Sequence, residues 1–307
     1  DNLSKQQILQ ERRLLAESGV ISYASLLPVI EKLTQESSYL VVSAVSSILQ
    51  GLSLFVDEGT EVEEAYKALL VTFNQFNFER LGFEPKAGEA DEDEMVRQLV
   101  ISNMIKGDDA EASAKASKIY AAHADDISKL PAAIRLQILI NQIKHHESKE
   151  LTDLYLTTYA QATDGNFKRQ LSTALAYTND AETVEKILTE WKNKDVVKPQ
   201  DLAMSWYFTF LHHDFTQESA WTWARENWEW VKAALGGDMS FDKFVIYPAN
   251  TFKTAERLAE FKAFFEPQLS DMAISRNISM GIKEIAARVD LIQREKAAVE
   301  AAILATK

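Results

Sequence analysis

The side chains with the most reactive chemistry in this sequence are five histidines and an excess of carboxylates. The segment 146–150, His-Glu-Ser-Lys-Glu, begins like a zinc motif in which two histidines four residues apart bind one metal ion from one side of a helix. Here Glu150 occupies the position of the second histidine. The adjacent histidines at 145–146 and at 212–213 point to different sides of a helix, so we predict no metal site at either pair.

A second candidate is the acidic run at 89–94, Glu-Ala-Asp-Glu-Asp-Glu. Carboxylates bind calcium, but this run lacks the alternating ligands and the glycine of an EF-hand loop. We therefore expect a solvated loop that leads into a helix. The sequence also contains no phosphate-binding loop, nucleophile elbow or dinucleotide fingerprint. It supplies no catalytic, cofactor-binding or metal-ligating residue, and we expect no enzymatic activity from this chain alone.

Composition narrows the classes of partner. The sequence has no cysteine, which excludes disulfides, thiolate zinc sites and cysteine nucleophiles, and which fits a reducing compartment, so we expect a cytoplasmic location. The net charge of -13 argues against nucleic acid as a partner, because a basic face supplies most of the affinity for phosphate backbones. No stretch approaches the roughly 18 uninterrupted apolar residues that span a bilayer, so we expect no membrane partner.

The elements that carry these side chains are predicted to be helices throughout. Only six prolines and ten glycines interrupt the 307 residues, and the apolar residues between them recur at three- and four-residue intervals. One such stripe follows Glu61 and consists of Val62, Tyr66, Leu69, Phe73 and Phe76. Another near the end consists of Ile274, Ile278, Ile282, Ile285, Val289 and Ile292. Few runs alternate with a period of two, so we predict an all-α chain.

The turn residues predict about fourteen helices of roughly 12 to 20 residues, paired antiparallel in an irregular, HEAT-like superhelix. Asp180 and Asp201 are predicted to cap helices, and Pro248 to mark a break between two of them. The loop 83–93 is a candidate sub-boundary. All six tryptophans fall between Trp191 and Trp230, and we expect them to fill core between stacked helices rather than to line a ligand groove.

Four segments, in the same order along the chain, resemble a known family. They are Leu-Ser at 3–4 with Glu-Arg-Arg-Leu-Leu-Ala-Glu-Ser-Gly at 11–19, Glu-Ser-Ser-Tyr at 36–39, Val-Lys-Pro-Gln-Asp at 197–201 with Ala-Trp-Thr-Trp-Ala-Arg-Glu-Asn-Trp at 220–228, and Phe-Lys-Ala-Phe-Phe at 261–265 with Arg-Asn-Ile-Ser-Met-Gly-Ile at 276–282. Together they are similar to the C-terminal domain of the zinc aminopeptidase N family, in a bacterial form. Met280 and Lys283 depart from the glutamine and glutamate that are usual in the last segment.

The resemblance implies a helical superhelix that folds over the catalytic domain and encloses a chamber that controls which peptides enter. It spans nearly all of 1–307, yet the zinc helix of the family has no counterpart here. The resemblance therefore implies zinc in the parent enzyme and no cofactor in this chain. It names the N-terminal catalytic part of the same enzyme and peptide substrates as the partners, and we expect one apolar face of the array to dock against that catalytic part.

Two alternatives to this interpretation remain at the level of sequence. A free-standing HEAT-like scaffold would hold a protein partner in its concave face, and its gene would begin close to Asp1. An unrecognised helical enzyme is disfavoured because no convergent reactive set is visible. Within the preferred interpretation, Arg276 lies off the apolar stripe of its helix and opens the last family segment. We predict that it faces the chamber and binds the carboxylate or carbonyl oxygens of a peptide.

Overall fold

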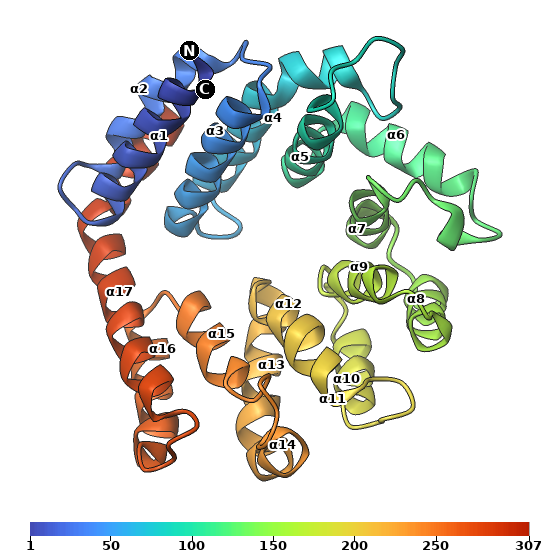
Figure 1. Ribbon diagram of the computed structural model, residues 1–307, viewed down its shortest axis with the longest axis vertical. Helices are drawn as coiled ribbons and strands as arrows, with labels where there is room; N and C mark the ends of the chain where they lie inside the picture. The colour runs from blue at the N-terminus through green and yellow to red at the C-terminus, as the bar shows by residue number, and fades with distance from the viewer. Residues whose placement is uncertain (307) are drawn as a thin grey trace. The chain divides into compact units, whose positions relative to one another are not determined.

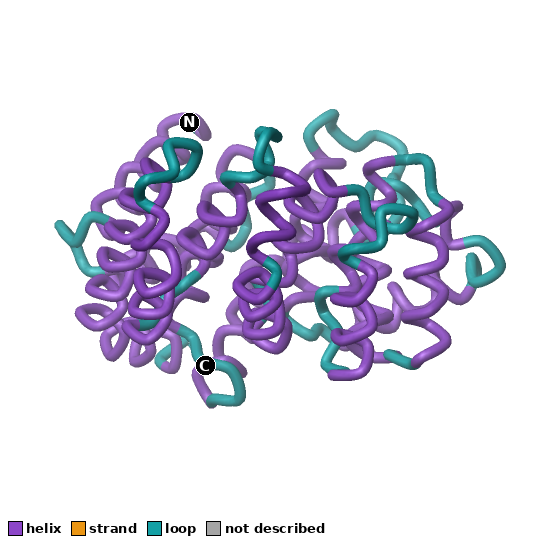
Figure 2. Tube along the Cα trace, turned by 90° about the horizontal axis from the view of Figure 1, so that it is seen from below, coloured by secondary structure: helices purple, strands orange, loops and turns teal. Residues whose placement is uncertain are grey.

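The computed structural model describes residues 1–306, and within them every regular element is helical, with no strand. Figure 2 shows helices joined by loops along the whole described chain. The all-α prediction is therefore confirmed. The chain forms two compact units: unit 1 consists of 1–125, 129–137 and the residues from Asp290 onward, and unit 2 consists of 126–128 and 138–289. The loop 83–93 lies inside unit 1, and a sub-boundary there stays a prediction.

Unit 1 begins with six α-helices, which are labelled α1 to α6 in Figure 1. They are α1 (Asn2–Glu17), α2 (Leu27–Ile30), α3 (Tyr39–Leu52), α4 (Glu61–Leu81), α5 (Asp93–Lys106) and α6 (Ala110–Ala121). Short 3₁₀ turns join some of them, the first at Tyr23–Leu26. Two helices belong to both units: α7 (Arg135–His146) begins in unit 1, and α17 (Ser275–Leu304) contributes to unit 1 from Asp290 onward.

The core of unit 1 forms where α3, α4 and α5 pack on one another. Of the predicted stripe on α4, Val62, Tyr66, Leu69 and Phe73 are buried, whereas Phe76 is half-buried. Thr60 caps this helix by accepting a hydrogen bond from the backbone N–H of Glu63, at 3.2 Å. The end of α17 completes the same core, which includes the buried side chains of Val299 and Ile303.

Helix α1 is attached to this core by a narrow strip. It packs on α3, and of its sixteen residues only Leu9 and Ala16 are buried. Asp1 caps it, because its carboxylate accepts a hydrogen bond from the N–H of Ser4 at 2.7 Å. Most of the surface of α1 is consequently open to solvent in the described structure.

A buried carboxylate connects α17 to the first turn after α1. Glu295 is 7% exposed and accepts hydrogen bonds from the hydroxyl of Ser22, at 2.7 Å, and from the backbone N–H of Tyr23, at 3.1 Å. Burial by itself raises the pKa of Glu295, but the hydrogen bonds from Ser22, Arg294 and Tyr23 outweigh it, so the pKa lies below its usual value. The ionised form of Glu295 thus stabilises unit 1.

Unit 2 consists mainly of shorter helices, several of which pack in consecutive pairs such as α8 with α9. They are α8 (Lys149–Gln161), α9 (Gly165–Leu175), α10 (Ala181–Glu190), α11 (Pro199–Asp201), α12 (Phe208–Leu211), α13 (Asp214–Glu226), α14 (Trp228–Leu235), α15 (Lys243–Thr251) and α16 (Ala255–Phe265), followed by the first part of α17. A π-helix, Leu202–Tyr207, links α11 to α12. Its wider turn places Trp206 and Tyr207 entirely inside the core of unit 2.

The tryptophans form an aromatic core in unit 2. Five of the six are buried and Trp230 is half-buried, so the prediction that they fill core is confirmed. Trp191 packs edge-on against Trp223, with ring centroids 5.0 Å apart, and Trp221 packs against Phe252 at 5.2 Å. Such tilted aromatic pairs add to the free energy gained from burial of the rings.

Two local predictions were wrong. Pro248 does not break a helix but lies buried inside α15, where the hydrophobic burial of its ring compensates for the missing N–H. Asp201 does not cap a helix either: α11 begins at Pro199, after Lys198, and no capping hydrogen bond comes from Asp201. Proline is favoured at the first position of a helix because the N–H it lacks has no partner there. Asp180, in contrast, caps α10 as predicted, through a 2.8 Å hydrogen bond from the N–H of Thr183.

Candidate functional site

The segment 146–150 is not one helix. α7 ends at His146 and α8 begins at Lys149, so His146 and Glu150 lie on different elements and do not share one face. Glu147 holds the turn that follows α9: its carboxylate accepts hydrogen bonds from the hydroxyl of Thr178 and from the backbone N–H of Asn179, the latter at 3.1 Å. The role of this segment in the described structure is therefore to fix a loop.

The two histidines at 212–213 diverge, as the sequence predicts for neighbours. The Nδ1 atom of His212 lies 2.6 Å from the carbonyl oxygen of Phe208, and its Nε2 atom lies 3.4 Å from the hydroxyl of Thr251. The ring of His213 packs instead against Tyr177, with centroids 3.9 Å apart. Among the residues that the structure describes, no group of three or more histidines and carboxylates is arranged to bind a metal ion.

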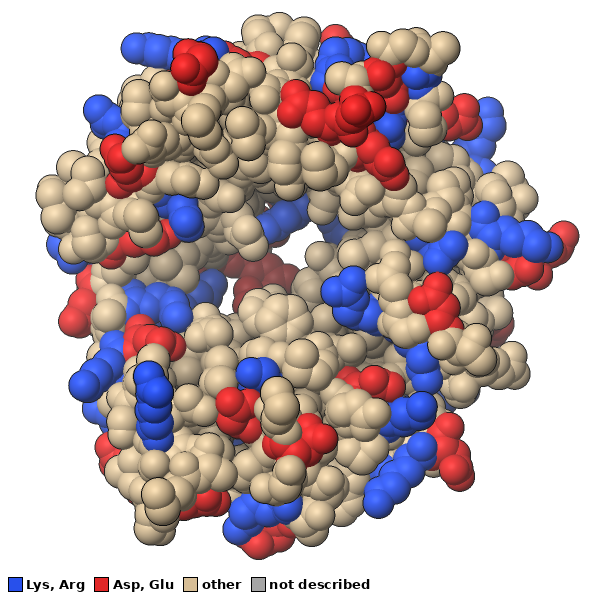
Figure 3. Space-filling view, in the orientation of Figure 1, with Lys and Arg blue, Asp and Glu red and all other residues tan. Residues whose placement is uncertain are grey.

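The acidic run at 89–94 anchors the connection between α4 and α5. Glu89 pairs with the guanidinium of Arg97, which is only 3% exposed, and Asp93 pairs with Arg80 at 2.6 Å. The hydrogen bond from Arg97 lowers the pKa of Glu89. Burial raises the pKa of Asp93, but the hydrogen bonds from Ala90 and Arg80 outweigh this effect, so the pKa of Asp93 lies below its usual value. On the face shown in Figure 3, acidic side chains gather over this connection. The run thus fastens a loop through paired carboxylates.

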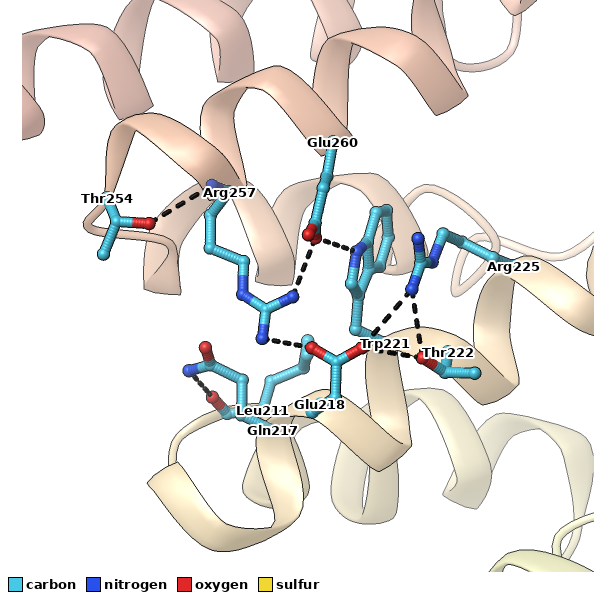
Figure 4. Close-up of polar contacts among 9 residues, drawn as sticks. All are labelled: Leu211, Gln217, Glu218, Trp221, Thr222, Arg225, Thr254, Arg257 and Glu260. Carbon is cyan, nitrogen blue, oxygen red and sulfur yellow. Dashed lines mark hydrogen bonds and ion pairs between the residues drawn. The ribbon is translucent and has the colours of Figure 1, made fainter.

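The most specific family segment, 220–228, lies at a polar network between α13 and α16 (Figure 4). The indole N–H of Trp221 donates to the carboxylate of Glu260 at 3.0 Å, and the same carboxylate accepts from Arg257 at 2.7 Å. Arg257 also pairs with Glu218 of α13, which in turn accepts from the hydroxyl of Thr222 at 2.9 Å. Trp221 itself is completely buried.

The charges in this network stabilise one another. Burial raises the pKa of Glu218, but hydrogen bonds from Arg257 and Thr222 outweigh it, and the pKa lies below its usual value. The guanidinium of Arg225 stacks over the ring of Trp221, 5.1 Å from its centroid. Every charged side chain drawn in Figure 4 therefore has a partner within the network. The sequence did not predict this network; its one local signal is the spacing of Arg257 and Glu260, which suits a pair on one helix face.

Two pockets among the described residues have a mainly apolar lining. One, of about 770 Å³, lies in unit 1 between the end of α4, the following turn and α6, over an apolar floor that includes Phe78, Phe83 and Ile134. Its rim carries three lysines and three glutamates, so charge favours no class of ligand. The other, of about 330 Å³, lies between α10 and α13 in unit 2, and Trp223 is the single tryptophan in its lining.

Arg276 occupies the second position of α17 and is exposed, as its place off the apolar stripe predicts. Ile274 and Ile278, on either side of it, are buried. The neighbouring Asn277 donates to Asp242 at 3.3 Å, whereas the side chain of Arg276 has no hydrogen bond or ion pair within residues 1–306. The guanidinium is thus available to a ligand or to solvent.

These observations define a class: an all-helical domain whose distinctive residues 220–228 hold helices together. We also find, among residues 1–306, no helix with the length and hydropathy needed to cross a bilayer. Residues 1–287 match the family model of the ERAP1-like C-terminal domain, and the chain belongs to this family.

Curated relatives agree with this assignment. The chain is 54% identical over 304 residues to an aminopeptidase N of Lactococcus lactis subsp. lactis, a match that covers 99% of this chain and 36% of that protein. It is 38% identical over 303 residues to aminopeptidase N of Lactobacillus helveticus, with the same two coverages, and 25% identical over 268 residues to aminopeptidase M1-B of rice, covering 86% and 30%. The chain therefore spans only about a third of the length of the relatives that it matches.

Proposed function

We propose that this chain is the non-catalytic C-terminal domain of a zinc aminopeptidase, and that it covers the active-site chamber and controls which peptides enter. The observation that carries the proposal is the match to aminopeptidase N of Lactococcus lactis, which extends over 99% of this chain but over only 36% of the relative. Zinc and the reactive groups then belong to the rest of the polypeptide. The cysteine-free sequence supports the cytoplasm as the compartment of this enzyme.

The residues of this chain do not fit a zinc site of their own. A catalytic zinc needs about three protein ligands that converge on one point, and the described histidines and carboxylates form no such group. His146 and Glu150, the pair with the nearest spacing, lie on separate helices. We therefore assign this chain no part in metal binding, and no step of peptide hydrolysis to its side chains.

The proposed architecture is a HEAT-like superhelix of antiparallel helix pairs. Its support is the succession of neighbouring helices that pack on each other within each unit, such as α4 with α5 and α8 with α9. Stacked pairs expose a long row of helix ends and faces, which suits a wall around a chamber better than a single compact bundle does. Peptide substrates and the catalytic part of the enzyme are the partners of that wall.

Arg276 is the residue that we propose as a peptide contact. It is exposed, while its helix neighbours Ile274 and Ile278 hold the helix in unit 2, so the guanidinium is presented on a fixed backbone. A guanidinium binds carboxylates and carbonyl oxygens through two parallel donors. It therefore suits the main chain or the C-terminus of a peptide better than an apolar side chain.

The first experiment compares the complete polypeptide with chain 1–307. We expect stoichiometric zinc and hydrolysis of an aminoacyl anilide from the complete polypeptide, and neither from chain 1–307. Zinc-supported turnover by chain 1–307 alone would contradict the proposal. The reading frame upstream of Asp1 distinguishes our proposal from the alternative of a free-standing scaffold. Our proposal predicts that it encodes a zinc helix, and the alternative predicts a start codon near Asp1.

The second experiment tests the chamber role in the complete enzyme. Arg276→Ala should raise KM roughly tenfold for long peptides, the effect of losing a hydrogen bond to a charged group, and should leave KM for an aminoacyl anilide unchanged because that substrate is too short to reach the guanidinium. Arg169→Ala, which removes another exposed arginine of unit 2, is the matched control. Equal effects on both substrates, or none on either, would leave Arg276 as an ordinary surface residue.

A further inference from the structure

We propose that the open face of α1 is a docking surface for the remaining part of the polypeptide, the part that the aminopeptidase N relatives have in addition to this domain. The inference rests on the proposed function, because it takes the rest of such an enzyme as the occupant. It goes further by naming the surface, which we call the α1 face and define as Leu3, Ile8, Leu14, Leu15 and Val20. Val20 follows the end of the helix.

The α1 face is apolar where a surface helix is normally polar. Leu3 is 64% exposed, Leu14 is 58% and Val20 is 69%, and Ile8 and Leu15 are also exposed. An amphipathic helix on the outside of a domain turns its apolar stripe inward and its polar residues outward. α1 has apolar residues on both sides, which is the pattern of a helix that is covered on both sides.

The register of α1 shows that the α1 face is distinct from the strip that packs on α3. Leu9 and Ala16, seven residues apart, form the buried strip. By the 100° turn per residue of an α-helix, Leu3 and Leu14 lie about 120° and 140° from Leu9 on one side, and Ile8 and Leu15 lie about 100° and 120° from Leu9 on the other. Two apolar rows therefore flank the outward side of the helix, and no rotation of α1 about its axis buries both rows and Leu9 together.

The rest of unit 1 does not share this property. Of the six large apolar side chains exposed in the described part of unit 1, five form the α1 face and the sixth is Met95 on α5. Single exposed apolar side chains are normal on any protein surface, whereas their concentration on one helix and its end is not. Between the two apolar rows lie Gln7 and Glu11, which hydrogen-bond to each other at 3.1 Å. Arg13 pairs with Glu17 of the same helix at 2.9 Å.

The extent of the face favours an occupant in the same polypeptide over a second copy of the chain. A stable interface between separate proteins uses roughly 20 residues on each side, and the α1 face offers five. A covalently connected domain does not lose the freedom of a separate molecule on docking, so a smaller apolar contact is sufficient. The greater part of each relative lies outside the match, and the matching family is a C-terminal domain, so that part precedes the segment to which α1 belongs.

The test is carbene footprinting of the complete polypeptide and of chain 1–307 at equal molar concentration. We expect labelling of Leu3 and Leu14 to fall about fivefold in the complete polypeptide, as for half-exposed side chains that become nearly buried, while Met95, the matched control, is labelled equally in both. Equal labelling of the α1 face in both proteins would overturn the proposal. Protection that appears in chain 1–307 alone as its concentration rises would also overturn it, in favour of a contact between copies.

A pair of variants gives an independent measurement. Leu14→Glu should leave the thermal unfolding of chain 1–307 unchanged, because Leu14 is already in water, but should make the complete polypeptide more susceptible to proteolysis. Met95→Glu should have no effect on either. If Leu14→Glu behaves like Met95→Glu in the complete polypeptide, the α1 face is not covered. The proposed function is tested separately, by the zinc content and anilide hydrolysis of the unmodified complete polypeptide. Failure of the proposed function is therefore distinguishable from failure of the docking role of the α1 face.

Discussion

Helices α1 and α13 differ little in length but are held in place in opposite ways. α1 buries Leu9 and Ala16 and leaves most of its remaining apolar side chains in water. α13 buries Trp221 completely and joins its polar side chains to α16 through Glu218 and Arg257. α13 therefore buries most of its apolar side chains and pairs charged groups such as Glu218 inside unit 2, with Phe215 its one large apolar side chain that is exposed, whereas α1 is buried along one side only.

The comparison separates two kinds of family segment. In the structure, the segment 220–228 serves the internal packing of unit 2. The segment 11–19 includes the second half of α1, where Leu14 is 58% exposed and Leu15 is 42% exposed in the described structure. A segment typical of a family can therefore stabilise a domain or prepare it for a partner, and the burial of its side chains distinguishes the two.

The largest expected effect is on the α13 side of this comparison. Trp221→Ala should lower the free energy of unfolding of unit 2 by about 3–5 kcal/mol, because it removes a fully buried indole and leaves a cavity. Trp221→Phe keeps an aromatic ring and loses the hydrogen bond to Glu260, so its cost should be about 1–2 kcal/mol. Urea unfolding followed by tryptophan fluorescence measures both. Equal costs for the two variants would show that the indole contributes only through that hydrogen bond.

The next effect is within α1 itself. In chain 1–307, Leu9→Ala should cost about 2–4 kcal/mol because Leu9 is buried against the core of unit 1. Leu14→Ala, the same change at an exposed position of the same helix, should stay within about 0.5 kcal/mol. Circular dichroism during urea unfolding gives both values. A similar cost at both positions would mean that α1 already has a partner on its outer side and would remove the contrast with α13.

The smallest effect is electrostatic and concerns Glu218. Because its pKa in the folded state lies below the unfolded value of about 4.3, its stabilising contribution is fully present above that value and is lost as pH falls through the folded-state pKa. The contribution should be less than about 1 kcal/mol, since more than half of the side chain is exposed. Unfolding measured from pH 6 to pH 3 should show a smaller loss in Glu218→Gln. An equal loss in the variant would mean that other carboxylates account for the acid sensitivity.

The helical class was predictable, because the three- and four-residue period extends along most of the chain and is a local property. The cap at Asp180 was predictable because capping also depends only on neighbouring residues. The π-helix at Leu202–Tyr207 was not, since its wider turn is stabilised by the burial of Trp206 and Tyr207 against distant residues. The predicted helix break at Pro248 was wrong because proline is disfavoured inside a helix by its own missing N–H, whereas here Pro248 is buried within α15.

The candidate site was harder to predict from the sequence than the fold was. The bond between Trp221 and Glu260 joins residues 39 positions apart, and no period or motif links them. The outward apolar rows of α1 are present in the sequence. They cannot be recognised from sequence alone, because the apolar residues of an amphipathic helix are expected to lie on one inward face. Burial was needed to show that Leu9 is covered and Leu14 is not.

The position of Glu295, Val299 and Ile303 in unit 1 has a consequence for synthesis on the ribosome. The core around α3 and α4 includes side chains from the last helix of the chain, and the turn at Ser22 and Tyr23 depends on a carboxylate that is translated more than 270 positions later. At roughly 5–20 residues per second, the first helices remain without these contacts for on the order of ten seconds or more while unit 2 is made. Unit 2, whose residues are nearly all consecutive, completes its own core first. Unit 1 can therefore complete its core only after the whole of unit 2 has been translated.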